Sequence, residues 1–211
     1  MICTSIAEEG LEACLKALDS LEFAEVRLDR TKLSRENIVQ IFSASKKLIA
    51  TYREGDEQNL RENTLILAID SGASMVDIEL ESTEEYRKKI IAKAREKNCE
   101  VIISYHNYEK TPSKNELEKI IEQCFEKGAD IAKIACKVNS EKDNARLLGL
   151  LDCEKKLVVI GMGRLGRMTR ILGPLLGSRF TFASAGAGKE TAEGQLSKKE
   201  MEEILEVLKN D

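Results

Sequence analysis

The sequence alternates between short apolar segments and amphipathic segments along its whole length, and this alternation constrains the fold more than any other feature. Short apolar runs predict strands buried on both faces, whereas the amphipathic segments carry apolar residues at helical spacing. The predicted strands cover residues 2–6, 23–28, 47–52, 74–80, 99–105, 128–136, 157–160 and 179–183. The predicted helices cover residues 8–20, 34–44, 57–71, 83–97, 113–127, 141–151, 165–172 and 198–208.

These strand–helix units have similar lengths and no break in composition between them, which predicts one domain over residues 1–211. Such units build a parallel sheet, and eight of them close most economically into a (β/α)8, or TIM, barrel of the α/β class. The barrel is expected to be compact, because domains of this kind typically have about 250 residues. An open doubly wound sheet is the alternative.

The composition indicates a soluble, cytoplasmic protein. Charged residues of both signs make up 33% of the chain and leave a net charge of -4, so neither nucleic acid nor a membrane is an expected partner. The N-terminal segment does not resemble a signal peptide, and no apolar run is long enough to span a bilayer. Six cysteines without paired spacing predict reduced thiols, neither disulfides nor a zinc site: Cys3, Cys14, Cys99, Cys124, Cys136 and Cys153.

A lysine lies in the middle of the sixth predicted strand. Because strand side chains alternate between faces, Lys133 shares one face with Ile131 and Ala135. Burying an ammonium among apolar side chains is costly and favours the neutral amine, which is a nucleophile towards carbonyl carbon. The alternative is a structural lysine that reaches water from the strand end or pairs with a carboxylate.

Polar side chains recur at the ends of the predicted strands, where barrel enzymes place their chemistry. A strand buried on both faces is expected to be apolar, so charges near several strand ends predict a polar pocket at the barrel mouth. Glu25, Arg27 and Asp29 are predicted to share one face of their strand. The residues at the strand ends are Ser5, Glu25, Arg27, Arg53, Glu54, Asp77, Glu79, His106, Lys133 and Met162.

His106 is the single histidine of the chain and ends the strand next to that of Lys133. This placement predicts a general acid/base beside an amine nucleophile, although a lone histidine is by default an ordinary surface or core residue. A metal site is not expected, because one histidine with dispersed carboxylates lacks convergent ligand spacing.

The segment 161–166 matches the glycine pattern G-x-G-x-x-G of dinucleotide-binding loops. That pattern normally opens the first strand–helix unit and is followed about 20 residues later by an acidic residue, neither of which holds here. We therefore interpret the segment as a tight turn. The basic residues that follow it, Arg164, Arg167 and Arg170, would suit a carboxylate or phosphate at the pocket rim.

The segment 184–195, between the last strand and the last helix, is rich in glycine and small polar residues. This composition is typical of an active-site lid, and equally typical of a plain connector.

An ordered set of motifs in this chain resembles the type I 3-dehydroquinate dehydratase family, whose members form a Schiff base in the shikimate pathway of aromatic amino-acid biosynthesis. The motifs follow the family's order over nearly the whole chain, and together they are specific. They are Glu25 to Asp29, Thr51 to Arg53, Ser104 to His106, Lys133 to Ala135, Met162-Gly163, Thr169-Arg170 and Gly194-Gln195.

The resemblance implies a syn elimination of water from 3-dehydroquinate to 3-dehydroshikimate, without a metal or organic cofactor. Lys133 resembles the lysine that condenses with the substrate ketone, and His106 the residue that removes and returns protons. Glu54 resembles the glutamate that orients this histidine, and Arg170 the arginine that binds the substrate carboxylate. The other substrate-binding positions that the resemblance implies are Ser5, Glu25, Arg27, Arg53, Met162, Thr191 and Gln195.

The resemblance also implies two features of architecture. Many relatives close the bottom of the barrel with an N-terminal hairpin, which this chain is expected to lack because its first predicted strand begins at Ile2. A homodimer is expected from family habit and from base rates alone.

Two other functions fit the same predicted barrel. A Schiff-base aldolase acting on a sugar phosphate would need a phosphate site in the glycine-rich loops after the seventh and eighth strands. A non-catalytic barrel that binds a small anion through Arg53 and Arg170 would not depend on Lys133.

Overall fold

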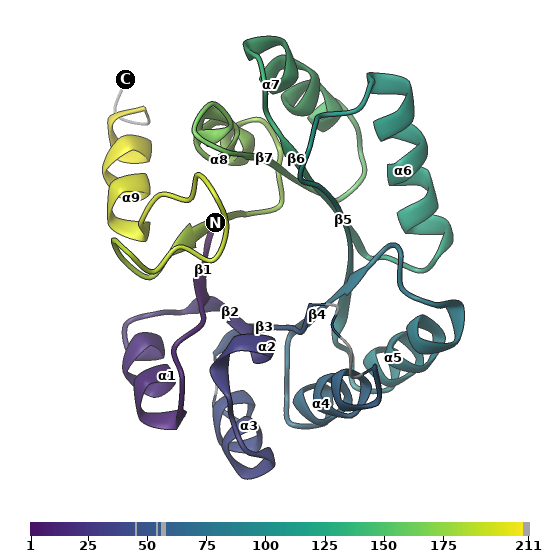
Figure 1. Ribbon diagram of the computed structural model, residues 1–211, viewed down its shortest axis with the longest axis vertical. Helices are drawn as coiled ribbons and strands as arrows, with labels where there is room; N and C mark the ends of the chain where they lie inside the picture. Colours follow the sequence, from purple (N-terminus) through teal and green to yellow (C-terminus); the bar gives the residue numbers. More distant parts are fainter. Residues whose placement is uncertain (45, 54, 56–57, 209–211) are drawn as a thin grey trace.

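The computed structural model describes residues 1–44, 46–53, 55 and 58–208. Eight parallel strands form an inner ring and the helices form an outer ring, so the predicted compact (β/α)8 barrel is confirmed (Figure 1). The strands are β1 (Ile2–Ile6), β2 (Phe23–Arg27), β3 (Lys47–Thr51), β4 (Met75–Glu79), β5 (Glu100–Asn107), β6 (Ile131–Lys137), β7 (Leu157–Met162) and β8 (Thr181–Ser184).

All α-helices but α2 lie close to their predicted positions, with ends moved by a few residues. They are α1 (Leu11–Leu18), α2 (Leu28–Thr31), α3 (Arg35–Phe42), α4 (Gln58–Asp70), α5 (Glu84–Glu96), α6 (Lys114–Glu126), α7 (Glu141–Leu148), α8 (Arg167–Leu172) and α9 (Lys198–Val207). Two 3-10 turns, η1 (Gly149–Leu151) and η2 (Gly173–Leu175), extend α7 and α8.

Serine side chains fix the starts of several of these helices. Ser34, Ser113 and Ser197 each accept a hydrogen bond from a backbone N–H of the first turn, and the side chain three residues later bonds back to the serine. Because the first N–H groups of a helix have no partner within it, such caps define where the helix begins.

Helix α2 was not predicted, and it corrects one expectation about a site residue. Asp29 lies in this short helix and not on the face of β2 that carries Glu25 and Arg27. Its carboxylate accepts two hydrogen bonds from the Arg27 guanidinium, at 2.9 and 2.7 Å. The chain therefore leaves the strand directly after Arg27, and Asp29 holds that guanidinium from outside the sheet.

The ring of strands has one seam. Hydrogen-bonded ladders join β7, β6, β5, β4, β3, β2, β1 and β8 in that order, and in the described part of the chain no ladder joins β7 to β8. At one end of the seam the Arg179 N–H donates to the Leu157 carbonyl at 2.7 Å. Further along, Nη1 of Arg170 donates to the Phe182 carbonyl at 3.2 Å. A side chain thus satisfies a β8 carbonyl on the side where no β7 ladder does.

Each strand faces two different environments. Outward side chains pack against the helices, whereas inward side chains form a separate apolar cluster inside the barrel, as the alternation in β6 predicts. Ile131, Lys133 and Ala135 point inward, and Ala132, Ile134 and Cys136 pack outward. The interior cluster consists of Cys3, Phe23, Ile49, Met75, Ile102, Ile131, Ala135, Val158, Ile160, Met162, Phe180 and Phe182.

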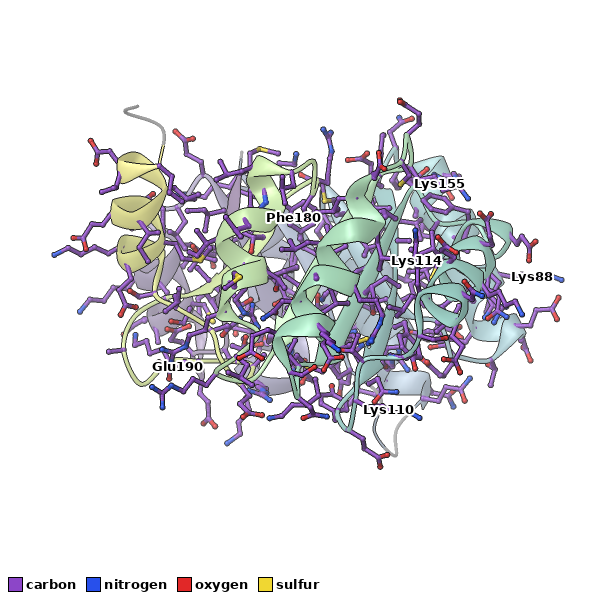
Figure 2. The ribbon with its side chains drawn as sticks, turned by 90° about the horizontal axis from the view of Figure 1, so that it is seen from above. Lys88, Lys110, Lys114, Lys155, Phe180 and Glu190 are labelled. Carbon is purple, nitrogen blue, oxygen red and sulfur yellow. The ribbon has the colours of Figure 1, made fainter. Side chains whose placement is uncertain are left out.

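Aromatic side chains fill the floor of the barrel, which is the end where the strands begin. Phe180 is fully buried and makes edge contacts with Phe23 and Phe182, at ring-centroid distances of 5.1 and 5.4 Å. Nζ of Lys47 lies 5.1 Å from the centroid of the Phe23 ring. Figure 2 places Phe180 towards the end opposite Glu190 and Lys110. These rings fill the barrel interior at that end, and the expected lack of a closing hairpin stays a prediction.

Within the described residues, none of the helices combines the length and the apolar character needed to cross a bilayer.

Candidate active site

A cavity of about 340 Å³ opens at the end of the barrel where the strands finish. This volume lies within the range of about 300–1,000 Å³ that is usual for small-molecule sites. Glu190 and Lys110, which belong to loops of this end, lie along the lower edge of the molecule in Figure 2. The cavity is lined by Ser5, Glu25, Arg27, Arg30, Arg53, His106, Tyr108, Lys133, Ala135, Lys137, Ile160, Met162, Arg170, Phe182, Thr191, Ala192, Glu193 and Gln195.

Most of the predicted site residues meet in this one cavity. Glu54 lies outside the described residues, so its proposed contact with His106 stays a prediction. Arg164 and Arg167 were expected at the pocket rim, and this was wrong, because both are exposed and do not line the cavity. The predicted residues that do line it are Ser5, Glu25, Arg27, Arg53, His106, Lys133, Met162, Arg170, Thr191 and Gln195.

Lys133 is buried in the wall of the cavity, with 6% of its surface exposed. Its Nζ donates a hydrogen bond to Oδ2 of Asp77 at 2.9 Å and lies 4.4 Å from the centroid of the Phe182 ring. Lys133 therefore does pair with a carboxylate, as expected if the lysine had only a structural role. The same lysine also faces an open cavity, which a purely structural lysine does not need.

Asp77 is the centre of a buried network of charges. Its carboxylate accepts two hydrogen bonds from the Arg53 guanidinium, at 2.9 and 3.0 Å, and one from the Ser104 hydroxyl at 2.6 Å. Burial alone would raise the pKa of Asp77, but the charges of Arg53 and Lys133 outweigh burial and hold this pKa well below its usual range. Asp77 is therefore ionised throughout the working range of pH.

His106 lies on β5, and its neighbours favour the neutral imidazole. Burial, and after it the positive charges of Arg53 and Lys133, lower the pKa of His106 well below its ordinary value, although Asp77 opposes this shift. Nδ1 is buried and has no hydrogen-bond partner among the described residues. The Tyr108 ring stacks on the imidazole, with centroids 6.0 Å apart and planes at 12°. A neutral imidazole of this kind can accept a proton.

Arg170 reaches the cavity from α8 as an incompletely paired cation. It is 1% exposed and donates to the Phe182 carbonyl, while Nε and Nη2 have no hydrogen-bond partner within the described residues. Burial, with a smaller contribution from Arg167, lowers the pKa of Arg170 to about 10, so the guanidinium is still charged at neutral pH. An unpaired buried charge is costly, and an anionic ligand would satisfy it.

Glu25 is held by two hydroxyl groups. Its carboxylate accepts hydrogen bonds from Ser5 at 2.7 Å and from Thr51 at 2.8 Å, each from a neighbouring strand. These two bonds fix both carboxylate oxygens of a side chain that is 4% exposed. The site therefore offers a rigid acceptor near the cations of Arg27 and Arg53.

The segment after β8 forms part of the cavity wall, which supports the prediction of a lid over that of a plain connector. The Gln195 side-chain carbonyl accepts from the Thr191 N–H at 2.7 Å, and the Gln195 amide donates to the Thr191 hydroxyl at 3.1 Å. Between these two residues, Glu193 pairs with Nζ of Lys137 at 2.6 Å. This segment is thus fastened to the last residue of β6.

The glycines of segment 161–166 serve close packing. A Cβ on Gly166 would lie 2.3 Å from the backbone of Gly161, and one on Gly194 would lie 2.3 Å from the Gly163 carbonyl. The Gly161, Gly163 and Gly166 N–H groups already donate to Thr169, Glu193 and Gly163 respectively. The interpretation as a tight turn fits this geometry, and these three glycine amides are not free to bind the phosphate of an aldolase substrate.

Four notable residues of the site had no predicted role: Asp77, which was predicted only as a strand-end residue, and Tyr108, Phe182 and Lys137. Two of them carried a signal that could have been used. Asp77 is a carboxylate in the middle of a buried strand, and Lys137 has the same strand parity as Lys133. The contact between Phe182 and Lys133, and the stacking of Tyr108 on His106, depend on tertiary geometry.

The fold and the cavity define a class of barrel enzyme that places a lysine, a neutral histidine and an unsatisfied arginine around one small-molecule site. The model of the family described as "Type I 3-dehydroquinase" matches residues 2–211. Accordingly, the chain belongs to the type I 3-dehydroquinase family, a family of hydro-lyases of the shikimate pathway.

The similarity to curated proteins covers the full length of the chain. A protein of Methanocaldococcus jannaschii named 3-dehydroquinate dehydratase is 35% identical over 223 residues, covering 99% of each chain. A protein of the same name from Methanococcus maripaludis strain C7 is 35% identical over 221 residues, covering 99% of this chain and 100% of its own. The crystal structure of 3-dehydroquinate dehydratase from Aquifex aeolicus VF5 superposes with a TM-score of 0.85 at 28% identity, covering 100% of both chains.

Proposed function

We propose that this protein is a 3-dehydroquinate dehydratase that works through a Schiff base on Lys133. The observation that carries the proposal is the convergence of Lys133, His106 and Arg170 on one cavity. These side chains offer an amine, a neutral base and a cation with free donors, which suit a substrate that has a ketone, an acidic C–H bond and a carboxylate.

The first step is condensation. The Lys133 amine attacks the ketone carbon, a C–N bond forms, and the carbonyl oxygen leaves as water to give a protonated imine. Nζ donates a hydrogen bond to the Asp77 carboxylate, and attack on the ketone needs the lone pair of this nitrogen, so an ammonium form must first lose a proton. The neutral imidazole of His106 is the base within the same cavity, because Asp77 is too acidic to accept a proton.

The second step is elimination. His106 removes the proton from the carbon next to the imine, the electron pair of the C–H bond forms a C=C bond, and the π electrons of the C=N bond move onto nitrogen to give an enamine. These electrons then expel the hydroxyl group on the following carbon, which takes the proton from His106 and leaves as water. Hydrolysis of the remaining imine returns the Lys133 amine and releases 3-dehydroshikimate. The imine is the electron sink, so the residues of the cavity suffice for each step.

The remaining lining residues would bind and orient the substrate. Arg170 would accept the substrate carboxylate in a charge-assisted pair, which satisfies its free donors. Glu25, Arg27 and Arg53 form the polar wall that would bind ring hydroxyls, while Thr191 and Gln195 would cover the site from the lid. Glu54 is proposed to orient His106 on the resemblance of its sequence position alone.

Borohydride trapping tests the proposal. The protein is incubated with 3-dehydroquinate and sodium borohydride, digested, and analysed by peptide mass spectrometry. We expect a reduced adduct on Lys133 and none on Lys137, which lies on the same face of the same strand. Dehydration without an adduct would contradict the imine, and an adduct confined to Lys137 would contradict the assignment of the nucleophile.

A further inference from the structure

Asp77 has no part in the steps proposed above, although it contacts the nitrogen on which they depend. Its Oδ2 lies 2.9 Å from Nζ of Lys133, and both side chains are buried. Asp77 belongs to β4 and Lys133 to β6, so the contact reaches across the intervening strand β5 inside the barrel. A carboxylate so close to the reacting nitrogen affects each charged form of that nitrogen.

The charge of Asp77 is fixed during the reaction. Oδ1 accepts from Nη1 of Arg53 and from Ser104, and Oδ2 accepts from Nη2 of Arg53 and from Lys133. With these donors around it, the carboxylate stays ionised and does not act as a proton acceptor. It can act on Lys133 as a counter-ion and a hydrogen-bond acceptor.

We propose that Asp77 is the counter-ion that keeps the imine on Lys133 protonated. This inference rests on the proposed function, because it requires the imine. When Nζ bonds to the ketone carbon and water leaves, the nitrogen of the protonated imine retains one N–H. Oδ2 of Asp77 is the acceptor that Nζ already has in the free protein, and it lies within reach to accept this remaining N–H.

Protonation of the imine decides whether the elimination proceeds. A protonated imine accepts the electron pair of the adjacent C–H bond, whereas a neutral imine is a much weaker electron acceptor. A carboxylate within hydrogen-bond distance favours the positive form. The face of the Phe182 ring, 4.4 Å from Nζ, favours the same form from another side. The two contacts act together on one nitrogen.

A purely structural role is the competing explanation, since Asp77 also holds Arg53. Glu79 provides a matched control on the same strand. Its carboxylate lies 3.9 Å from Nη1 of Arg53 and 3.1 Å from Nη2 of Arg61. Glu79→Gln perturbs the same arginine and leaves the carboxylate at Lys133 in place.

The pH profile of kcat separates the two roles. For Asp77→Asn we expect the alkaline limb of kcat to move to lower pH by about one pH unit or more, because removal of an adjacent opposite charge has an effect of that size. For Glu79→Gln we expect the alkaline limb of kcat to fall at the same pH as in the unmodified protein. An Asp77→Asn limb that coincides with that of the unmodified protein overturns the counter-ion role, even if kcat and stability fall.

If Asp77→Asn does not fold, a second measurement tests whether Asp77 keeps the imine protonated. The proposed function predicts that His106→Ala accumulates the imine while Asp77 is intact. We expect this imine to keep its proton to a pH well above that of the ketimine formed by a simple alkylamine with 3-dehydroquinate, as followed by ultraviolet absorbance. Equal values would overturn the inference.

Borohydride trapping and the pH profile together distinguish failure of the Asp77 role from failure of the proposed function. If borohydride traps no adduct in the unmodified protein, both are overturned. If the adduct forms on Lys133 and the alkaline limb does not move in Asp77→Asn, only the role of Asp77 is overturned.

Discussion

The floor and the mouth of the barrel are built from inward-pointing side chains of the same strands, yet the floor is apolar and the mouth is charged. On β2, β4 and β6 the inward residue near the floor is Phe23, Met75 or Ile131. Two residues further along each strand, the inward residues are Glu25, Asp77 and Lys133. One step of the two-residue repeat therefore separates a layer that stabilises the barrel from a layer that can carry chemistry.

The two layers contribute differently to stability. Burial of apolar surface at the floor stabilises the fold by about 25 cal/mol for each Å² removed from water. At the mouth, each buried charge needs a partner, and Asp77 supplies one for both Arg53 and Lys133. Arg170 lacks a full set of partners among the described residues, so part of its desolvation cost is left for a ligand to offset.

Lys133→Met is expected to have the largest effect on kcat, and it tests whether the mouth of the barrel carries the chemistry. Without the amine, kcat is expected to fall by at least about 10⁴-fold, because the covalent step is lost. The fold should persist, since Asp77 keeps its bonds to Arg53 and Ser104. Steady-state kinetics and circular dichroism measure the two effects. Turnover close to that of the unmodified protein would show that Lys133 belongs to the structural layer.

Phe180→Ala is the corresponding test of the floor. Removing this fully buried ring is expected to lower the free energy of unfolding by about 3–5 kcal/mol, through lost burial and the cavity left behind. Urea unfolding measures this loss, and Phe180→Leu should cost less. The kcat of the folded variant should change little. A large fall in kcat at unchanged stability would show that the two layers are not separable.

Arg170→Met tests whether the unsatisfied cation binds substrate. We expect KM for 3-dehydroquinate to rise by about 10- to 100-fold, which corresponds to the loss of a hydrogen-bonded charge pair. Arg167→Met, at an exposed position of the same helix that does not line the cavity, is the control. If both variants raise KM equally, the effect comes from net charge and not from a carboxylate at Arg170.

The protonation of His106 gives a pH-dependent test. Its lowered pKa means that the folded protein binds fewer protons than the unfolded chain between the folded pKa and about 6.5, so stability falls as the pH drops below about 6.5. The acid limb of kcat/KM should likewise lie below 6.5. Because the chain has one histidine, its NMR titration can be assigned without ambiguity. A titration at or above 6.5 would contradict the lowered pKa of His106.

Lys137→Met is expected to have the smallest effect. Its ion pair with Glu193 is partly exposed, and such pairs contribute about 0.2–1 kcal/mol, so KM should rise by no more than about fivefold. High salt should reduce the difference from the unmodified protein. A loss of kcat comparable to that of Lys133→Met would contradict this and show that the second lysine also takes part in the chemical steps.

The amino-acid sequence alone determined the eight strand–helix units and which side chains of β6 share a face. Both follow from local periods in the side chains, which the backbone enforces whatever the tertiary structure. The order of the units also gathered Lys133, Glu25, Arg27, Arg53 and His106 at one end of the barrel, because the carboxyl ends of parallel strands meet there.

Only the tertiary structure decided which of these side chains touch. The contact between Asp77 and Lys133 crosses a strand inside the closed barrel, and no spacing in the sequence encodes that distance. The three arginines after β7 look alike in sequence, yet Arg170 alone of these turns into the seam beside β8, while Arg164 and Arg167 are exposed. Pairing, burial and the free donors of a buried charge depend on how the ring of strands closes, which is a property of the whole chain.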